Sequence, residues 1–332
     1  MTTRPSPAWP GLDLDLRYFG RGLGLGICLL LAAGCGDGGG ATPDASVVDD
    51  APAGDAPDFG DPLASAGQVE LVQGGFLFTE GPQWREAQGE LVFSDVQGNT
   101  IYRFPSGGGA AVSLLNPSNN SNGIATDGAG MLVAAHHGSR NVTRGGTAIA
   151  STFEGKKLNS PNDVIVADDG TIYFTDPPYG IQDAQRELDF CGVFRVSPGG
   201  TLTAEYRGAL TTRPNGVGLS PDGSTLYVAD TSDGKVYRYP VQAGGALGTR
   251  AIFAQTSGNP DGLAIDVAGN VFVSTSTGVE AFSPTGARWG VIAVPMQPAN
   301  CAFGDADHRT LYITARTAVY RVRLAHPGLP RR

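Results

Sequence analysis

Six copies of one short pattern follow one another along the chain and constrain its fold more than any other feature. Each copy begins with a polar residue, continues as a short apolar strand, turns at Gly or Asp, and returns through a second apolar strand. The copies start 42, 40, 53, 46 and 39 residues apart, at Glu80, Asn122, Asn162, Asn215, Asp261 and Asn300. Repeats of about 40 residues built from short strands are typical of propeller blades. The sequence therefore predicts an all-β, six-bladed β-propeller.

Further apolar runs fill out four-stranded antiparallel blades within a propeller domain at 69–325, followed by a tail at 326–332. Third strands are expected at 100–104, 192–196, 235–239, 279–282 and 319–324, and fourth strands at 111–115, 202–207, 250–254 and 288–294. The last blade has only three strands of its own, and the segment 68–73 (QVELVQ) has no other partner. We expect this N-terminal segment to be the outer strand of the last blade, because ring closure removes an open sheet edge.

Composition excludes other classes of protein. The 49 Gly and 23 Pro argue against a helical bundle, and 41% hydrophobic residues argue against general disorder. A net charge of −9 argues against nucleic acid or an anionic lipid surface as the partner. The segment 36–68 contributes −7 of this charge, because it holds seven Asp and no Lys or Arg. We expect a monomer that acts on a small molecule.

The first 68 residues indicate export and tethering. Arg17 and Arg21 precede an apolar stretch at 22–34, which is too short to span a bilayer and typical of a signal segment. Residues 1–35 resemble a lipoprotein signal peptide, with Cys35 lipidated as the mature N-terminus; the alternative is an ordinary cleaved signal. The acidic segment 36–68 is predicted to be a disordered linker. The expected location is the periplasm or cell surface, with the lipid anchor as the only membrane contact.

The six starting residues are predicted to form a metal site. The first strand of every propeller blade lines the central channel, so these residues meet at one end of it. Two carboxylates (Glu80 and Asp261) and several amide oxygens, without His or Cys, favour Ca²⁺, with Mg²⁺, Mn²⁺ or Zn²⁺ as alternatives. Without a cation, one of the two carboxylates would be driven to protonate. Alternatively, Asn-Gly and Asp-Gly pairs are common turn formers and could simply open strands.

Residues 69–324 resemble the senescence marker protein, gluconolactonase and luciferin-regenerating enzyme family. The resemblance is carried by EGPQW at 80–84, NSPNDV at 159–164, FTDPPYGI at 174–181, ELDFCGVFRV at 187–196, PNGVGLSPD at 214–222, PDGLAID at 260–266 and NCAFG at 300–304. It implies a six-bladed propeller with a divalent metal, usually Ca²⁺. The metal ligands it implies are Glu80, Asn162, Asn215 and Asp261, whereas Asn122 and Asn300 would face the substrate or support the ligands.

The resemblance also implies an activity. The family hydrolyses lactones of sugar acids, and some relatives hydrolyse organophosphate esters. The metal would polarise the lactone carbonyl as a Lewis acid, and Asp261 would be the catalytic general base on water. No G-x-S-x-G motif is present, so nothing indicates a serine nucleophile. The alternatives are a non-catalytic binding propeller with a structural metal, and an aryl ester or phosphotriester hydrolase at the same site.

Three further residues are predicted to bind substrate. The segment 136–140 (HHGSR) resembles the HGNR segment of bacterial gluconolactonases, which points to His137 and Arg140. Ser139 and Asn141 depart from that pattern and leave the sugar specificity open. Asp163, beside a predicted ligand, could bind substrate hydroxyls. The alternative for His137 is a structural histidine, and for Asp163 a turn residue that opens a strand.

Overall fold

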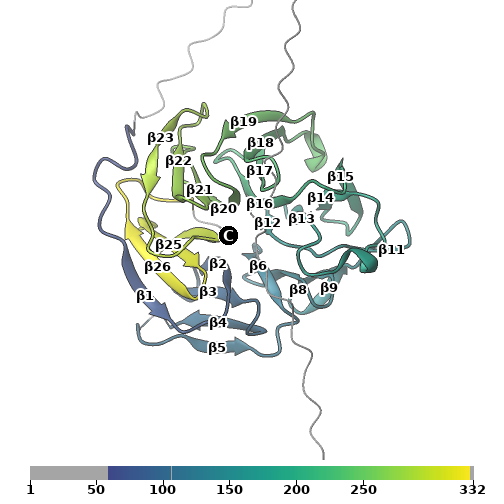
Figure 1. The fold of residues 1–332 in the computed structure, drawn as a ribbon, viewed down its shortest axis with the longest axis horizontal. Helices are drawn as coiled ribbons and strands as arrows, with labels where there is room; N and C mark the ends of the chain where they lie inside the picture. Colours follow the sequence, from purple (N-terminus) through teal and green to yellow (C-terminus); the bar gives the residue numbers. More distant parts are fainter. Residues whose placement is uncertain (1–58, 106, 330–332) are drawn as a thin grey trace, which may run out of the picture. The chain divides into compact units, whose positions relative to one another are not determined.

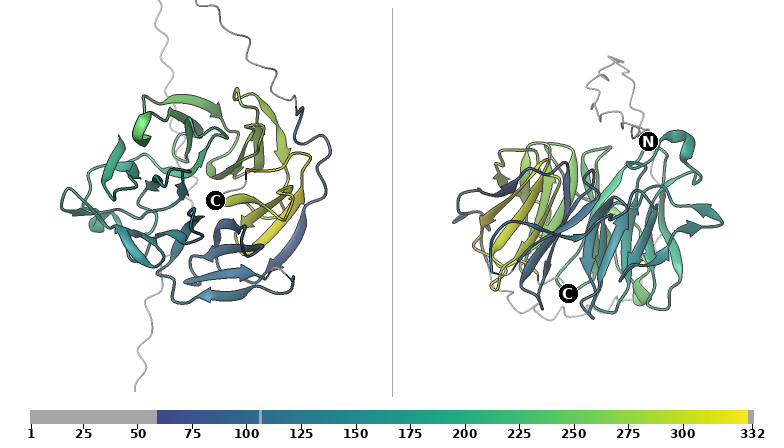
Figure 2. Two further views of the ribbon diagram at one scale, coloured as in Figure 1. Left: turned by 180° about the vertical axis from the view of Figure 1, so that it is seen from behind. Right: turned by 90° about the horizontal axis from the view of Figure 1, so that it is seen from below.

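The computed structural model describes residues 59–105 and 107–329, so the predicted signal peptide and most of the linker lie outside the described residues. Six four-stranded antiparallel sheets surround a central axis in this part of the chain, which confirms the predicted six-bladed propeller (Figure 1). The blades stand side by side when the ring is seen from its edge (Figure 2). In the described residues, no helix is long and apolar enough to cross a membrane.

Within each blade the strands follow the chain outward from the axis. The first three blades are β2 (Thr79–Arg85), β3 (Glu90–Asp95), β4 (Thr100–Phe104) and β5 (Val112–Leu115); β6 (Ser121–Thr126), β7 (Leu132–His136), β8 (Asn141–Arg144) and β9 (Thr147–Ala150); and β12 (Val164–Val166), β13 (Ile172–Asp176), β14 (Cys191–Val196) and β15 (Leu202–Gly208). The sequence pattern did not predict β8 and β9, the two outer strands of the second blade.

The remaining blades repeat this arrangement. They are β16 (Pro214–Leu219), β17 (Thr225–Asp230), β18 (Lys235–Pro240) and β19 (Ala251–Gln255); β20 (Pro260–Ile265), β21 (Val271–Thr275), β22 (Gly278–Phe282) and β23 (Arg288–Ile292); and β24 (Asn300–Gly304), β25 (Thr310–Ala315) and β26 (Ala318–Arg323) with β1 (Glu70–Gly74). Minor elements are the hairpin β10 (Thr152–Phe153) and β11 (Lys156–Lys157) and the 3₁₀ turns η1 (Asp183–Gln185) and η2 (Ala243–Gly245).

The strand β1 closes the ring, as the sequence predicts. It pairs antiparallel with β26, with Glu70 opposite Arg321 and Gly74 opposite Ala318. The Glu70 carboxylate and the Arg321 guanidinium form an exposed ion pair at 2.9 Å. The first and last strands of the domain therefore lie side by side in one sheet (Figure 1).

The hydrophobic core lies between neighbouring blades. One cluster joins the fifth and sixth blades through Phe272 of β21 and Leu311 and Ile313 of β25, all fully buried. Burying each such side chain stabilises the fold by about 1.5–3 kcal/mol. By contrast, the outer strand β5 is exposed along its whole length. The inner and second strands are thus fixed between two blades, and the outer strands face solvent.

The segment after β26 crosses the end of the channel where the inner strands finish. Gly328 forms a β-bridge with Asp266, and its N–H donates to the carbonyl of His308 at 2.7 Å. The N–H of Leu329 donates to the carbonyl of Ile265, the last residue of β20, at 3.1 Å. The predicted tail therefore begins with residues that pack on the propeller.

Removal of the closing strand should destabilise the whole ring. We expect deletion of 68–74 to expose the edge of β26 and to reduce the free energy of unfolding by about 2 kcal/mol or more, a fall in Tm of about 4–8 °C. Differential scanning calorimetry would measure it. A chain that begins at Phe59 keeps every strand and is the control. An unchanged Tm after the deletion would show that β1 does not hold the ring closed.

Candidate active site

The six predicted channel residues lie at the same end of the channel. Five of them lie inside inner strands, and Asn162 lies two residues before β12. Five of the six are buried and Asp261 is half-buried; the buried residues are Glu80, Asn122, Asn162, Asn215 and Asn300. The structure therefore brings together the complete set that the repeat predicts.

A β-bulge in each of four inner strands orients the channel residue of that strand. The pairing between the inner and second strands shifts register directly after Glu80 in β2 and across Asn122, Asn215 and Asp261 in β6, β16 and β20. A bulge bends its strand and redirects a side chain. Here it frees the start of the strand from regular pairing, so that polar side chains point to the axis.

The glycine after a channel residue permits neighbouring blades to approach closely. A Cβ atom at Gly262 would lie 1.9 Å from Cγ of Asn300, and one at Gly216 would lie 2.3 Å from the carbonyl oxygen of Asp261. Neither glycine has a left-handed φ, and both lie within strands. The turn-former interpretation is therefore wrong at these positions, because the glycines serve close packing around the axis.

Aspartates at the ends of second strands hold the loops that lead into the site. Asp176, the last residue of β13, accepts hydrogen bonds from the N–H groups of Asn159 at 2.8 Å and Ser160 at 2.7 Å. Burial raises the pKa of Asp176 to about 7, against the opposing effect of these N–H groups. Asp95 in the first blade and Asp230 in the fourth bind the corresponding loops in the same way.

A chain of amide hydrogen bonds links three blades. Asn122 Nδ2 donates to Asn162 Oδ1 at 2.7 Å, and Asn162 Nδ2 donates to Asn215 Oδ1 at 2.5 Å. Asn215 Nδ2 in turn donates to Thr231 Oγ1 at 3.0 Å. The chain fixes the orientation of each amide, and with it the direction in which each oxygen points.

His137, a predicted substrate-binding residue, joins this chain. Its Nε2 lies 3.1 Å from Asn122 Nδ2 and 3.1 Å from Asn162 Oδ1, so its tautomer decides which contact is the hydrogen bond. Burial lowers the pKa of His137 to about 4, despite the hydrogen bond to Asn162. The imidazole is therefore neutral at pH 7. It can donate a hydrogen bond to a ligand or accept one from it.

The carboxylates occupy the other side of the channel. Burial raises the pKa of Glu80 well above its usual value, followed by repulsion from Asp261 and Asp163; the N–H of Gly81 and the side chain of Asn300 donate hydrogen bonds that act against this. Burial also raises the pKa of Asp261, followed by repulsion from Asp163. Anionic groups are thus concentrated in a desolvated space.

Two predicted substrate-binding residues form hydrogen bonds with backbone groups beside the site. Asp163 accepts hydrogen bonds from the N–H groups of Val164 at 3.0 Å and Val217 at 3.1 Å, which ties the third blade to the fourth. Arg140 Nε donates to the carbonyls of Leu158 at 2.7 Å and Asn159 at 2.9 Å. Direct substrate contacts by Asp163 and Arg140 stay predictions.

Loops bring two residues to the site that the repeat does not identify. Tyr179, from the connection after β13, hydrogen bonds through its hydroxyl to Thr231 and Asn215, and its pKa is raised by burial. Arg316, in the turn between β25 and β26, lowers the pKa of Asp261 by its charge. Tyr179 lies inside the FTDPPYGI motif, whereas Arg316 has no signal in the sequence because a turn residue carries no strand pattern.

The donor set fits a hard divalent cation. Glu80 and Asp261 supply charge, and Asn162 and Asn215 supply amide oxygens, which are ligands that Ca²⁺ accepts. Among the described residues, no group of three or more His, Cys, Asp or Glu could hold a metal ion, as expected for a set that takes two oxygens from asparagine. Burial raises the pKa of both carboxylates, and the charge of Arg316 opposes this effect at Asp261.

Known proteins are similar to this chain in sequence and in fold. Residues 78–317 match the family model described as the SMP-30/gluconolactonase/LRE-like region. A gluconolactonase of Zymomonas mobilis is 33% identical over 77% of this chain and 81% of its own length. A gluconolactonase structure from Xanthomonas campestris has a TM-score of 0.73 and 35% identity, over 80% of this chain and 91% of that one. The calcium-binding protein regucalcin of Agrobacterium tumefaciens, at 18% identity and a TM-score of 0.66 over 79% and 97%, shares the fold.

Substitution of Gly262 should destabilise the packing of the inner strands around the axis. A Cβ atom there overlaps Asn300, so Gly262→Ala should reduce the free energy of unfolding by about 1–3 kcal/mol, measured by urea denaturation. Gly128→Ala is the control, because a Cβ atom at Gly128 meets nothing within 4 Å and its φ is not left-handed. Equal stability of the two variants would contradict the close approach at the axis.

Proposed function

Because this chain belongs to the SMP-30/gluconolactonase/LRE-like family, we propose that it is a lactonase that opens sugar-acid lactones at the channel end marked by Glu80 and Asp261. The observation that carries this proposal is the convergence of the Glu80 and Asp261 carboxylates and an ordered chain of asparagine amides on one axis. The gluconolactonase relatives supply the substrate class.

We propose that Glu80, Asn162, Asn215 and Asp261 hold a divalent cation, with calcium as the first expectation. The raised pKa values of Glu80 and Asp261 support this, because a bound cation would balance the charge that burial disfavours. A cation held there would polarise the lactone carbonyl.

The protein residues supply the proton transfer. An oxygen of Asp261 takes a proton from water as the water oxygen adds to the lactone carbonyl carbon. The bond between that carbon and the ring oxygen then breaks, and the proton passes to the ring oxygen, which gives the hydroxy acid. Asn215 donates a hydrogen bond to Asp261, and the charge of Arg316 lies near the same carboxylate. Both favour the ionised form of Asp261, which is the form that accepts a proton.

The neutral residues around the carboxylates bind and orient the substrate. His137 and Asn122 lie on one side of the site, and Asn300 lies beside Glu80 on the other. Uncharged donors and acceptors suit the hydroxyl groups of a sugar lactone. A metal that only plugged the channel would not require them, and this observation favours an enzyme over a non-catalytic binding propeller.

We also propose that the chain is exported and tethered by a lipid on Cys35, and that it acts as a monomer. The apolar stretch at 22–34, which ends in Ala-Ala-Gly and is followed by Cys35, supports the anchor. Cys35→Ala should release the protein from membranes prepared from cells expressing the full chain, while Cys28→Ala should leave it bound. Membrane association of Cys35→Ala would contradict the anchor.

Asp261→Asn should remove turnover while leaving the fold intact. Loss of the base should lower kcat by about 10²-fold or more on gluconolactone, followed by acid release at constant pH. The control is Asp168→Asn, an exposed carboxylate in the turn at the opposite end of the inner strands. Full activity of Asp261→Asn would remove its role as base, and no turnover of sugar lactones, homoserine lactones or aryl esters by the unmodified chain would remove the enzyme proposal.

Calcium should stabilise the protein through the same residues. We expect Ca²⁺ at about 100 times its Kd to increase the free energy of unfolding by about 2.7 kcal/mol and chelator to abolish both this gain and turnover. Scanning calorimetry with and without Ca²⁺ would measure the gain. Glu80→Gln should lose it, whereas Asp168→Asn should keep it. A calcium-dependent gain that survives in Glu80→Gln would place the ion elsewhere.

A further inference from the structure

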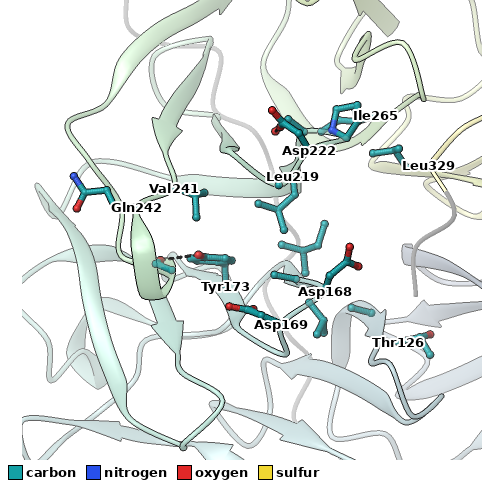
Figure 3. Close-up of a pocket in the computed structure, with 18 of the residues that line it drawn as sticks. Thr126, Asp168, Asp169, Tyr173, Leu219, Asp222, Val241, Gln242, Ile265 and Leu329 are labelled. Atoms are coloured by element: carbon teal, nitrogen blue, oxygen red, sulfur yellow. Dashed lines mark hydrogen bonds between the residues drawn. The ribbon is translucent and has the colours of Figure 1, made fainter.

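A cavity lies at the end of the channel opposite the proposed active site. Its volume is about 440 Å³, and residues from the ends of inner strands and from the turns that follow them line it (Figure 3). Val166 ends β12, Leu219 ends β16 and Ile265 ends β20, and Leu329 from the C-terminal segment completes the wall. This cavity shares no lining residue with the proposed active site.

The cavity combines an aliphatic wall with an acidic rim. Ala125, Ile165, Leu219 and Ile265 supply apolar surface around the axis. The charged residues that line the cavity are Asp168, Asp169 and Asp222, and no Lys or Arg is among the lining residues that the structure describes. An anionic ligand is therefore disfavoured, and a ligand with positive charge at the rim is favoured.

Two of the carboxylates at the rim accept hydrogen bonds that hold them in place. Asp169 Oδ1 accepts a hydrogen bond from the N–H of Thr171 at 2.8 Å. Asp222 accepts hydrogen bonds from the Ser220 hydroxyl at 2.6 Å and the Ser224 N–H at 3.0 Å, and these bonds lower its pKa. The side chains of Asp168 and Asp169 are labelled with Asp222 around the same space in Figure 3.

Two residues that line the cavity each hold a buried polar atom that has no hydrogen-bond partner among the described residues. Gln83 is 0% exposed; its Nε2 donates to the carbonyl of Trp84 at 2.8 Å, and its Oε1 has no hydrogen bond. Thr126 is 7% exposed, and its Oγ1 also lacks a partner. Both residues line the cavity. A buried acceptor without a partner costs about 1–3 kcal/mol, so a ligand that donates hydrogen bonds here would be stabilised.

From these features we propose that the cavity binds an aliphatic diammonium ion. One ammonium group donates hydrogen bonds to Gln83 Oε1 and Thr126 Oγ1, the methylene chain contacts the aliphatic wall, and the second ammonium group lies at the carboxylates of the rim. A bare metal ion suits the site less well, because the wall offers aliphatic carbon where such an ion needs oxygen ligands. This site is separate from the proposed lactonase function and does not depend on it.

Calorimetric titration of the full chain with 1,5-diaminopentane, in buffer with chelator, tests the proposal. We expect one saturable site, and a Kd at least about tenfold weaker in the double variant Asp168→Asn, Asp169→Asn, because two rim charges are lost. Pentane-1,5-diol has the same length without charge and should bind at least about tenfold more weakly than the diamine. Thr126→Val, which keeps the side-chain shape, should also weaken binding.

Matched controls separate this site from the proposed active site. Asp261→Asn should keep the Kd for the diamine within about twofold, and the double rim variant should keep its lactone turnover. Asp222→Asn provides a second rim variant if the double variant does not fold by circular dichroism. The proposal is overturned by the absence of binding at about 10 mM diamine, by an unchanged Kd in the rim variants, or by loss of binding in Asp261→Asn.

Discussion

The burial of Glu80 and Asp261 at one end of a narrow channel is the constraint on which the rest of the site depends. Burial disfavours both charges, and repulsion adds to this effect, from Asp261 and Asp163 at Glu80 and from Asp163 at Asp261. The surrounding structure is organised to tolerate this: glycines permit neighbouring blades to approach, aspartates such as Asp176 hold the entering loops, and asparagine amides are fixed in one direction. The fold thus holds two carboxylates together in a desolvated space. This concentration of negative charge supports the proposal of a bound cation that polarises an ester carbonyl.

Each of the inner strands β6, β16 and β20 serves two environments along its length. At its start the bulge releases the backbone from regular pairing, and a polar side chain turns to the axis. At its end the pairing is regular and aliphatic residues such as Leu219 and Ile265 face the cavity. One strand of six residues therefore contributes to a polar site and to an apolar cavity, and the two ends can be altered separately.

The sequence alone predicts the blade number, the closing strand and the six axial residues, because each depends on a pattern repeated along the chain. It does not predict β8 and β9, whose short sequences NVTR and TAIA carry little apolar signal. Arg316 is also missed, since a turn places it at the site through tertiary contacts alone. Arg140 and Asp163 show a further limit: sequence places them beside the site, but their hydrogen bonds to backbone groups depend on the packed loops.

Ring closure also governs how the protein reaches its native state. Glu70 and Arg321, which face each other in the closing sheet, are 251 positions apart in the chain. Contacts between such distant residues form late, because the entropy of closing so long a loop must be offset before they stabilise anything. A nascent chain therefore displays an unpaired sheet edge until its last blade has been synthesised. Chaperones that cover exposed edges would act on this protein during that interval, and its yield would respond to their abundance more than its final stability suggests.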